Sequence, residues 1–124
     1  MTTPTHEATH TVTDADTARA VGSGDLDVLG TPVLVAWCEA ATCAALDLPA
    51  EATSVGTRVD VRHLAPSPVG ATVTVRATVA EQSDRAATFT VEARQADTQI
   101  AAGTVTRAIV DRRRFLDRVN GVRA

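Results

Sequence analysis

The fold of this chain is decided by one stretch, Thr31-Pro-Val-Leu-Val-Ala-Trp-Cys-Glu-Ala-Ala-Thr-Cys-Ala-Ala-Leu-Asp-Leu48. It holds the only long helical pattern in the sequence. Thr31 is a candidate N-cap, and Pro32 suits the first helical position. Apolar residues at three- and four-residue spacing predict one wide apolar face, made by Val33, Leu34, Trp37, Ala40, Ala41, Ala44, Ala45 and Leu48. Because alanine dominates this face, a flat partner such as a β-sheet could approach closely.

Nearly everything after the helix reads as strand. Period-2 alternation predicts strands over residues 55–64, 71–81, 86–95 and 99–111. The turns between them are short, which indicates antiparallel neighbours. Before the helix we expect a short strand at 9–13, a short helix at 14–20 and disorder at 1–8. Residues 112–119 are expected to form a helical or irregular tail.

These elements predict an α+β fold in one domain, residues 1–124: one long central helix wrapped by a curved antiparallel sheet of about five strands. A single helix leaves one sheet face and at least one sheet edge uncovered. Such sheets commonly pair with a second copy, so we expect a homodimer or a tetramer built from it.

Composition narrows the functional classes. The net charge is −3, and all twelve basic residues are arginine with no lysine. No basic and aromatic residues interleave, which argues against nucleic-acid binding. No signal peptide and no membrane-spanning run is visible, so we expect a cytoplasmic protein that does not bind membranes. Cys38 and Cys43 lie about 140° apart on the helix and cannot bridge each other. They indicate neither a disulfide framework nor a metal site.

Three residues are candidates for chemistry. Glu39 lies mid-helix with no Lys or Arg between Thr31 and Leu48 to pair with it. It could face solvent, or it could face the sheet, where desolvation would make it a useful base or nucleophile. His63 shares a strand face with valines, so it is either a packed core or interface residue or a general base. Thr31 is either an N-cap only or a hydroxyl that also orients a reacting group. Thr31 and Glu39 lie about 12 Å apart along an ideal helix, so His63 or a substrate would have to bridge them.

Other positions carry weaker signals. Gly56 and Thr57 open the strand that holds His63. They are either a β-bulge or a place where a backbone N–H is left free to hold an oxyanion. His6 and His10 have no acidic or cysteine partner in register, so no metal ligand is assigned. The Arg112–Arg114 run is read as a solvated basic end, although it could also meet the phosphates of a nucleotide-bearing ligand.

An ordered set of these residues resembles a known family. The set is Gly30-Thr31, the helix with Trp37 and Glu39, Gly56-Thr57, Val61-x-His63, the Gly70-x-x-Val73-x-Val75 strand entry, Gly103-Thr104 and Arg113-x-Phe115-x-x-x-Val119. It is similar to the hot-dog-fold thioesterases related to the fluoroacetyl-CoA thioesterase. The likeness runs from about residue 9 to residue 119.

The resemblance implies a hot-dog fold and an enzyme that hydrolyses an acyl-CoA thioester without a cofactor. By this resemblance Thr31, Glu39 and His63 match the catalytic residues, and Gly56 matches a glycine that lines the acyl site. Glu39 would be nucleophile or general base, His63 would transfer a proton, and Thr31 would orient the attacking group. Residues 22–30 contain no phenylalanine. The fluoroacetyl-specific enzyme has an aromatic lid there, so we expect small or medium acyl-CoA substrates instead of fluoroacetyl-CoA.

Three other functions stay open. A hot-dog hydratase or dehydratase needs an Asp and a His together, but Asp60 is predicted on the strand face opposite His63. A non-catalytic module that binds acyl-CoA or a small ligand would leave Glu39 exposed or salt-bridged. A purely structural dimer would use Thr31 as a cap and His63 in packing only.

Overall fold

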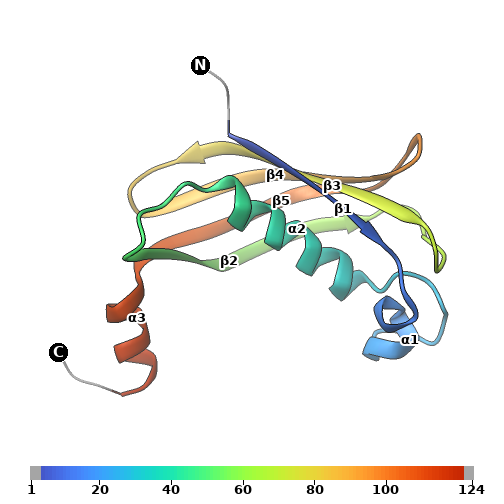
Figure 1. The fold of residues 1–124 in the computed structure, drawn as a ribbon, viewed down its shortest axis with the longest axis horizontal. Coiled ribbons are helices and arrows are strands. Elements are labelled where there is room, and N and C mark those ends of the chain that lie inside the picture. The colour runs from blue at the N-terminus through green and yellow to red at the C-terminus, as the bar shows by residue number, and fades with distance from the viewer. Residues whose placement is uncertain (1–3, 122–124) are drawn as a thin grey trace.

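The computed structural model describes residues 4–121. The strands are β1 (Thr5–Thr11), β2 (Ala52–His63), β3 (Thr72–Gln82), β4 (Ala86–Gln95) and β5 (Thr98–Asp111). The helices are η1 (Asp14–Asp16), α1 (Ala18–Val21), α2 (Thr31–Ala45) and α3 (Arg112–Val119). All five strands form one antiparallel sheet in the order β1-β3-β4-β5-β2, and α2 runs along one face of it (Figure 1). The predicted α+β architecture is confirmed.

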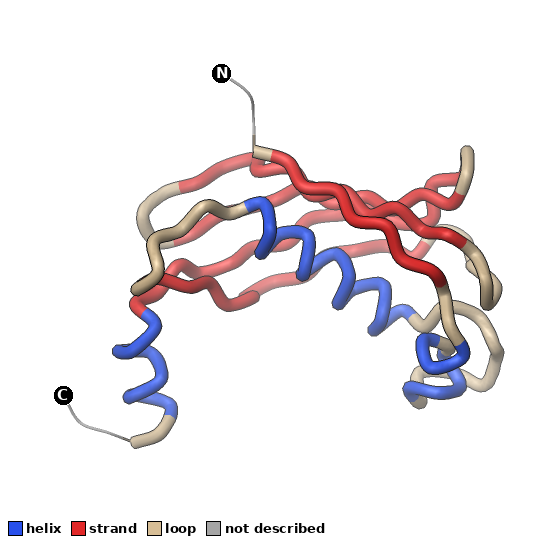
Figure 2. The backbone as a smooth tube through the Cα atoms, viewed as in Figure 1, coloured by secondary structure: helices blue, strands red, loops and turns tan. Residues whose placement is uncertain are grey.

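The core lies between α2 and the sheet. The alternation read from the sequence holds, because the inward residues of β3 and β4 are buried and their threonine and charged neighbours are not. Figure 2 shows the helix crossing the curved sheet obliquely. The largest fully buried apolar side chains are Phe89, Leu29, Leu34, Ile100, Val12, Val73, Val75 and Val105.

Two predictions about α2 were wrong in detail. The buried face consists of Leu34, Cys38, Ala41 and Thr42, whereas Ala40 and Ala44 are exposed. Thr42 can be buried because its hydroxyl donates a 2.6 Å hydrogen bond to the backbone carbonyl of Glu39, which satisfies the polar group. The helix also ends at Ala45 instead of Leu48. Compared with the predicted apolar face, the buried face of α2 is rotated about the helix axis toward the side that carries Cys38.

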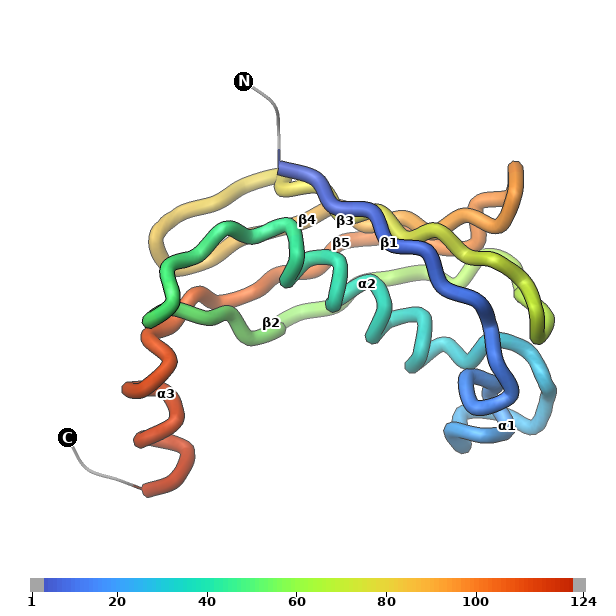
Figure 3. The backbone as a smooth tube through the Cα atoms, viewed as in Figure 1, coloured from blue at the N-terminus to red at the C-terminus, as the bar shows by residue number. Residues whose placement is uncertain are grey.

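The N-terminal segment is more ordered than expected. Thr5–Ala8 belong to β1, which pairs along its whole length with β3, so the prediction of disorder was wrong for these residues. Residues 1–3 of that predicted segment lie outside the described residues. Threonine has a high strand propensity, and the pairing with β3 supplies the backbone hydrogen bonds that the isolated segment lacks. Following the chain in Figure 3, η1 and α1 lie at the end of the molecule where α2 begins.

The edge strand β2 contains a β-bulge. Gly56 pairs with Arg107 on β5, but Arg58 pairs with the next residue, Thr106, so Thr57 is the extra residue. Paired residues lie on the same face of a sheet. Gly56 and His63, seven residues apart, would face opposite sides of a regular strand. Because of the bulge, both face α2.

Candidate functional site

The hydroxyl of Thr31 is hydrogen-bonded to the ring of His63. Thr31 Oγ1 lies 2.8 Å from His63 Nδ1. The N-cap of α2 is Gly30, with Thr31 and Pro32 following as the first helical residues, so the predicted N-cap role of Thr31 was wrong. A threonine at the cap would use its hydroxyl on backbone N–H groups. Here the hydroxyl is available for the imidazole, and the structure thereby joins the first turn of α2 to the last residue of β2.

The other ring nitrogen of His63 is buried without a protein partner. Nε2 has no hydrogen bond among the described residues. Burial lowers the pKa of His63 below its ordinary value near 6.5, and the backbone of Ala65 opposes this shift only in part. The ring is therefore neutral at pH 7, which is the state that a general base needs. A pocket of about 290 Å³ opens beside it, lined by Val28, Thr31, His63, Leu64, Ala65 and Pro66.

Glu39 lies against the sheet, with part of its side chain exposed to solvent. Its side chain is 35% exposed, and Oε2 lies 3.5 Å from Nη1 of Arg107 on β5. The carboxylate also lies directly against Gly56, because a Cβ built on that glycine would be 2.7 Å from Oε2. The absence of a side chain at Gly56 is what lets the carboxylate reach β2.

Arg107 was missed in the sequence. It is 6% exposed. Its Nε donates to Ser54 Oγ at 2.8 Å, and its Nη2 donates to the Ser54 carbonyl at 3.1 Å. The alternation of β5 was a usable signal, because Arg107 falls on the same face of the strand as the buried Ala101 and Val105. An arginine on an inward face needs a partner.

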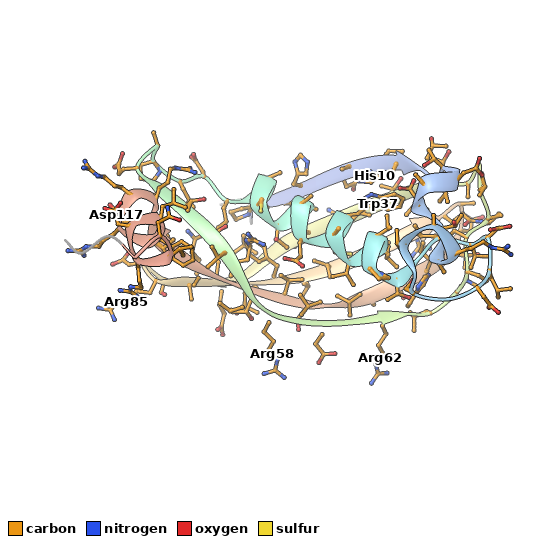
Figure 4. The ribbon with its side chains drawn as sticks, turned by 90° about the horizontal axis from the view of Figure 1, so that it is seen from below. His10, Trp37, Arg58, Arg62, Arg85 and Asp117 are labelled. Atoms are coloured by element: carbon orange, nitrogen blue, oxygen red, sulfur yellow. The ribbon has the colours of Figure 1, made fainter. Side chains whose placement is uncertain are left out.

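The remaining candidates have structural roles. Thr57 donates its hydroxyl to the Thr106 carbonyl at 3.2 Å, which holds the bulge. Asp60 pairs with Thr104 and so faces away from His63, as predicted. Figure 4 shows Arg58 and Arg62 pointing away from α2 on that same side of β2. Burial, with a smaller contribution from Glu39, raises the pKa of the Cys38 thiol to about 11, which leaves no thiolate for chemistry at neutral pH.

The site residues form two groups within one chain. Thr31 and His63 make one group, and Glu39, Gly56 and Arg107 make the other. The groups are separated by eight residues of α2, about 12 Å, and by seven residues of β2, about 23 Å. One chain therefore does not bring Glu39 and His63 together.

The other surface depressions have fewer side chains that could act in catalysis. The larger depression, about 630 Å³, lies on the sheet face away from α2 and is lined by Glu7, Ala71, Thr72, Thr74, Arg76, Glu92, Arg94, Gln95 and Ala96. It contains no histidine, cysteine or serine. Within residues 4–121 no group of three or more His, Cys, Asp or Glu could hold a metal ion. No helix in the described part is long and apolar enough to cross a membrane.

Comparisons with known proteins identify relatives of this architecture. The model of the fluoroacetyl-CoA-specific thioesterase family matches residues 12–113. A search of curated proteins finds no match.

Solved structures agree with the family match. The fluoroacetyl-CoA thioesterase FlK is 25% identical with a TM-score of 0.89, over 100% of this chain and 98% of that chain. A phenylalanine-to-alanine mutant of FlK is 26% identical with a TM-score of 0.89, over 98% and 96%. A hot-dog-like protein from Thermanaerovibrio acidaminovorans is 23% identical with a TM-score of 0.87, over 96% and 90%, and this likeness concerns the fold. The predicted hot-dog fold is confirmed.

Proposed function

The chain belongs to the fluoroacetyl-CoA-specific thioesterase family and is a thioester hydrolase, and we propose that it cleaves small or medium acyl-CoA thioesters to the free acid and CoA. The observation that carries the proposal is the Thr31–His63 hydrogen bond beside a pocket, with Nε2 of the neutral ring buried and unpaired. A mutant of FlK has been solved with acetyl-CoA, which supports a small acyl group.

The proposed roles follow from what each group can do. Glu39 attacks the thioester carbonyl as a nucleophile, or activates a water molecule as a general base. The C–S bond breaks with CoA leaving as the thiolate, and the proton that ends on its sulfur comes from the attacking water. Neutral His63 accepts that proton as a base and passes it to the thiolate, taking it from the water that hydrolyses the acyl–Glu39 anhydride or, when Glu39 is the general base, from Glu39. Thr31 holds the ring through Nδ1. The backbone N–H of Gly56 is the candidate oxyanion donor, since no side chain blocks approach. No metal or cofactor takes part in this scheme.

The substrate is proposed not to be fluoroacetyl-CoA. Residues 22–30 contain no phenylalanine, so they cannot form an aromatic lid. Backbone hydrogen bonds hold the C-terminal end of this segment in place. Leu29 N–H donates to the Ser67 carbonyl at 2.8 Å, and Gly30 N–H donates to the Asp16 carbonyl at 2.9 Å. Leu26 in its middle is exposed. Such an entrance favours acyl chains over recognition of one fluorine atom.

We propose that the active form is a homodimer paired through β2. This strand forms one edge of the sheet, and Val59 near its middle is 40% exposed. Two β2 strands paired antiparallel about Asp60, with the bulged Thr57 of each strand left out of the pairing, would set Gly56 of each chain opposite His63 of the other. Glu39 of one copy would then meet Thr31 and His63 of its partner, giving two complete sites. The helix α3, which extends past β2 and exposes Leu116 and Val119, supports a partner on this side (Figure 1).

One observation favours a second function. Glu39 is ion-paired with Arg107, as expected for a non-catalytic module that binds acyl-CoA. The contact is 3.5 Å long, whereas charge-assisted hydrogen bonds are about 2.7–2.9 Å. The carboxylate is also 35% exposed, so it stays accessible to a substrate. Both points favour the enzyme.

The experiment follows free CoA with a thiol reagent across a panel of acyl-CoA chain lengths. We expect turnover by the wild type, and a loss of kcat of about 10²- to 10⁴-fold in Glu39→Gln and His63→Ala without loss of fold or dimer. Full activity of Glu39→Gln would contradict the proposed role of Glu39 as nucleophile or general base. Binding of acyl-CoA by calorimetry with no CoA release on any substrate would support the binding module.

A further inference from the structure

We propose that Arg107 is a positioning residue that fixes the carboxylate of Glu39 against Gly56. The inference rests on the proposed function of Glu39 and adds a residue to it. It concerns the placement of a side chain, so it can be tested with and without turnover.

The guanidinium of Arg107 is itself held in place. Ser54 on β2 accepts two hydrogen bonds from it, one at the hydroxyl from Nε and one at the carbonyl from Nη2. Two bonds from a planar fork to one residue fix the plane of the group. Nη1 is the nitrogen that remains, and it is the one directed at Glu39 Oε2.

The burial of Arg107 requires a negative partner. Its side chain is 7% exposed, and a buried arginine keeps its charge. Among the described residues, Glu39 is the carboxylate that lies within ion-pair distance of it. The Ser54 contacts satisfy hydrogen bonds of the guanidinium but bring no negative charge. The charge of Arg107 is therefore balanced by the carboxylate of Glu39.

Glu39 needs such a restraint. A glutamate on a helix surface has three rotatable bonds and samples several rotamers. Within its own helix, Glu39 accepts a hydrogen bond from Thr42 at its backbone carbonyl, and no hydrogen bond from the described part of α2 reaches its carboxylate. Against β2, the carboxylate is bounded by Gly56 on one side and by Nη1 of Arg107 on the other. A displacement of about 1 Å in a reacting group can cost about 10²-fold in rate.

A structural role alone is the competing explanation, because Arg107 also ties β5 to the first part of β2. The two roles differ in a measurable way. If Arg107 only ties the strands together, replacing it should lower the thermal stability. If its charge positions Glu39, replacing it should lower kcat, and an added small cation should restore part of that kcat.

The test compares three variants with a matched control. Arg107→Met keeps the length of the side chain without its charge, Arg107→Lys keeps the charge without the fork, and Arg107→Ala leaves a space for added guanidinium. Arg62→Met is the control, because Arg62 is an exposed arginine on β2 that points away from α2.

We expect kcat on the best acyl-CoA to fall by about 10²-fold in Arg107→Met, with KM little changed and with partial recovery in Arg107→Lys. Guanidinium should raise the kcat of Arg107→Ala and leave Glu39→Gln unaffected. Arg62→Met should match the wild type. A folded Arg107→Met with wild-type kcat overturns the proposal, as does a loss of kcat that only follows loss of thermal stability and is not rescued.

A crystal structure of Arg107→Met tests the proposal without measuring activity. We expect the Glu39 side chain to leave Gly56 for solvent. A carboxylate that stays on Gly56 overturns the positioning role whether or not the protein hydrolyses thioesters. An inactive wild type, by contrast, counts against the proposed function alone.

Discussion

Thr31 and His63 are joined by a 2.8 Å hydrogen bond across 32 positions of sequence. One residue opens the long helix, and the other closes the edge strand. The bond is possible because Gly30, and not Thr31, caps the helix. It holds the imidazole through Nδ1 and leaves Nε2 without a hydrogen-bond partner among the described residues.

Replacing Thr31 by valine removes this bond while keeping the shape of the side chain. We expect kcat/KM to fall by about 10²-fold, the lower end of what a positioned acid–base group contributes. Thermal stability should not show the loss of about 1 kcal/mol that follows removal of an N-cap side chain, because Gly30 is the cap. Thr31→Ser retains the hydroxyl and is the control. Equal losses in both variants would mean that the hydroxyl is not what matters.

The pH profile should carry the signature of His63. Its pKa lies below 6.5, so the ring takes up a proton only at a pH below that value. As a general base it stays active at pH 6.5, and the acid limb of kcat/KM should fall below that pH. Titration of kcat/KM from about pH 5 to about pH 8 measures it. His6→Gln is the control and should leave the limb unchanged. An acid limb centred above pH 6.5 would contradict the assignment.

The same shift has a consequence for folding. Between the lowered pKa and 6.5, the unfolded chain binds a proton at His63 that the folded chain does not. The free energy of unfolding should therefore decrease as the pH falls through this window. Urea titrations at several pH values measure it, and His63→Gln should weaken the dependence. A dependence identical in the variant and the wild type would exclude His63 as its source.

Two glycines of the β2–β5 pair predict opposite outcomes for the same substitution. In Gly56→Ala the new Cβ meets the end of the Glu39 side chain, which can move. We expect activity to be lost with little change in stability. In Gly103→Ala it meets the backbone of Asp60 and Val61, which cannot move without breaking the strand pair. We expect a lower melting temperature there. A fully active Gly56→Ala would show that the carboxylate need not lie on that glycine.

The edge of β2 is where the dimer should be sensitive. Val59→Asp places a charge next to the proposed two-fold axis, on the α2-facing side of β2, and charges on edge strands oppose pairing. We expect monomers in sedimentation experiments and a loss of activity that higher protein concentration partly restores. Val69→Asp is the matched control, since Val69 is 42% exposed and lies outside β2. Monomers of Val59→Asp with full activity would contradict a shared site.

Most of the architecture follows from local pattern. The strands after α2 alternate so regularly that the inward residues of β3 and β4 could be named from the sequence. The first strand was predicted to begin at residue 9, whereas it begins at Thr5. The prediction missed its start because the inward side of the strand alternates alanine with histidine, which gives little hydrophobic signal. Its order comes from pairing with β3, which is a long-range interaction.

The site was only partly predictable for a related reason. Thr31, Glu39 and His63 stand out by type and position, but their grouping depends on the bulge at Thr57, which sets which face Gly56 takes. Local sequence does not fix that register. Arg107 was missed because a charged residue in a strand is usually exposed, and its burial depends on Ser54 and Glu39 from two other elements.

The contact between β1 and α2 gives the protein a built-in optical reporter. Trp37, the only tryptophan of the chain, stacks on His10 with ring centroids 4.3 Å apart and an angle of 4° between the planes (Figure 4). Its emission depends on whether the first strand lies against the central helix. Fraying of that outer strand would change the fluorescence while the interior stays packed, so local opening could be followed without any added label.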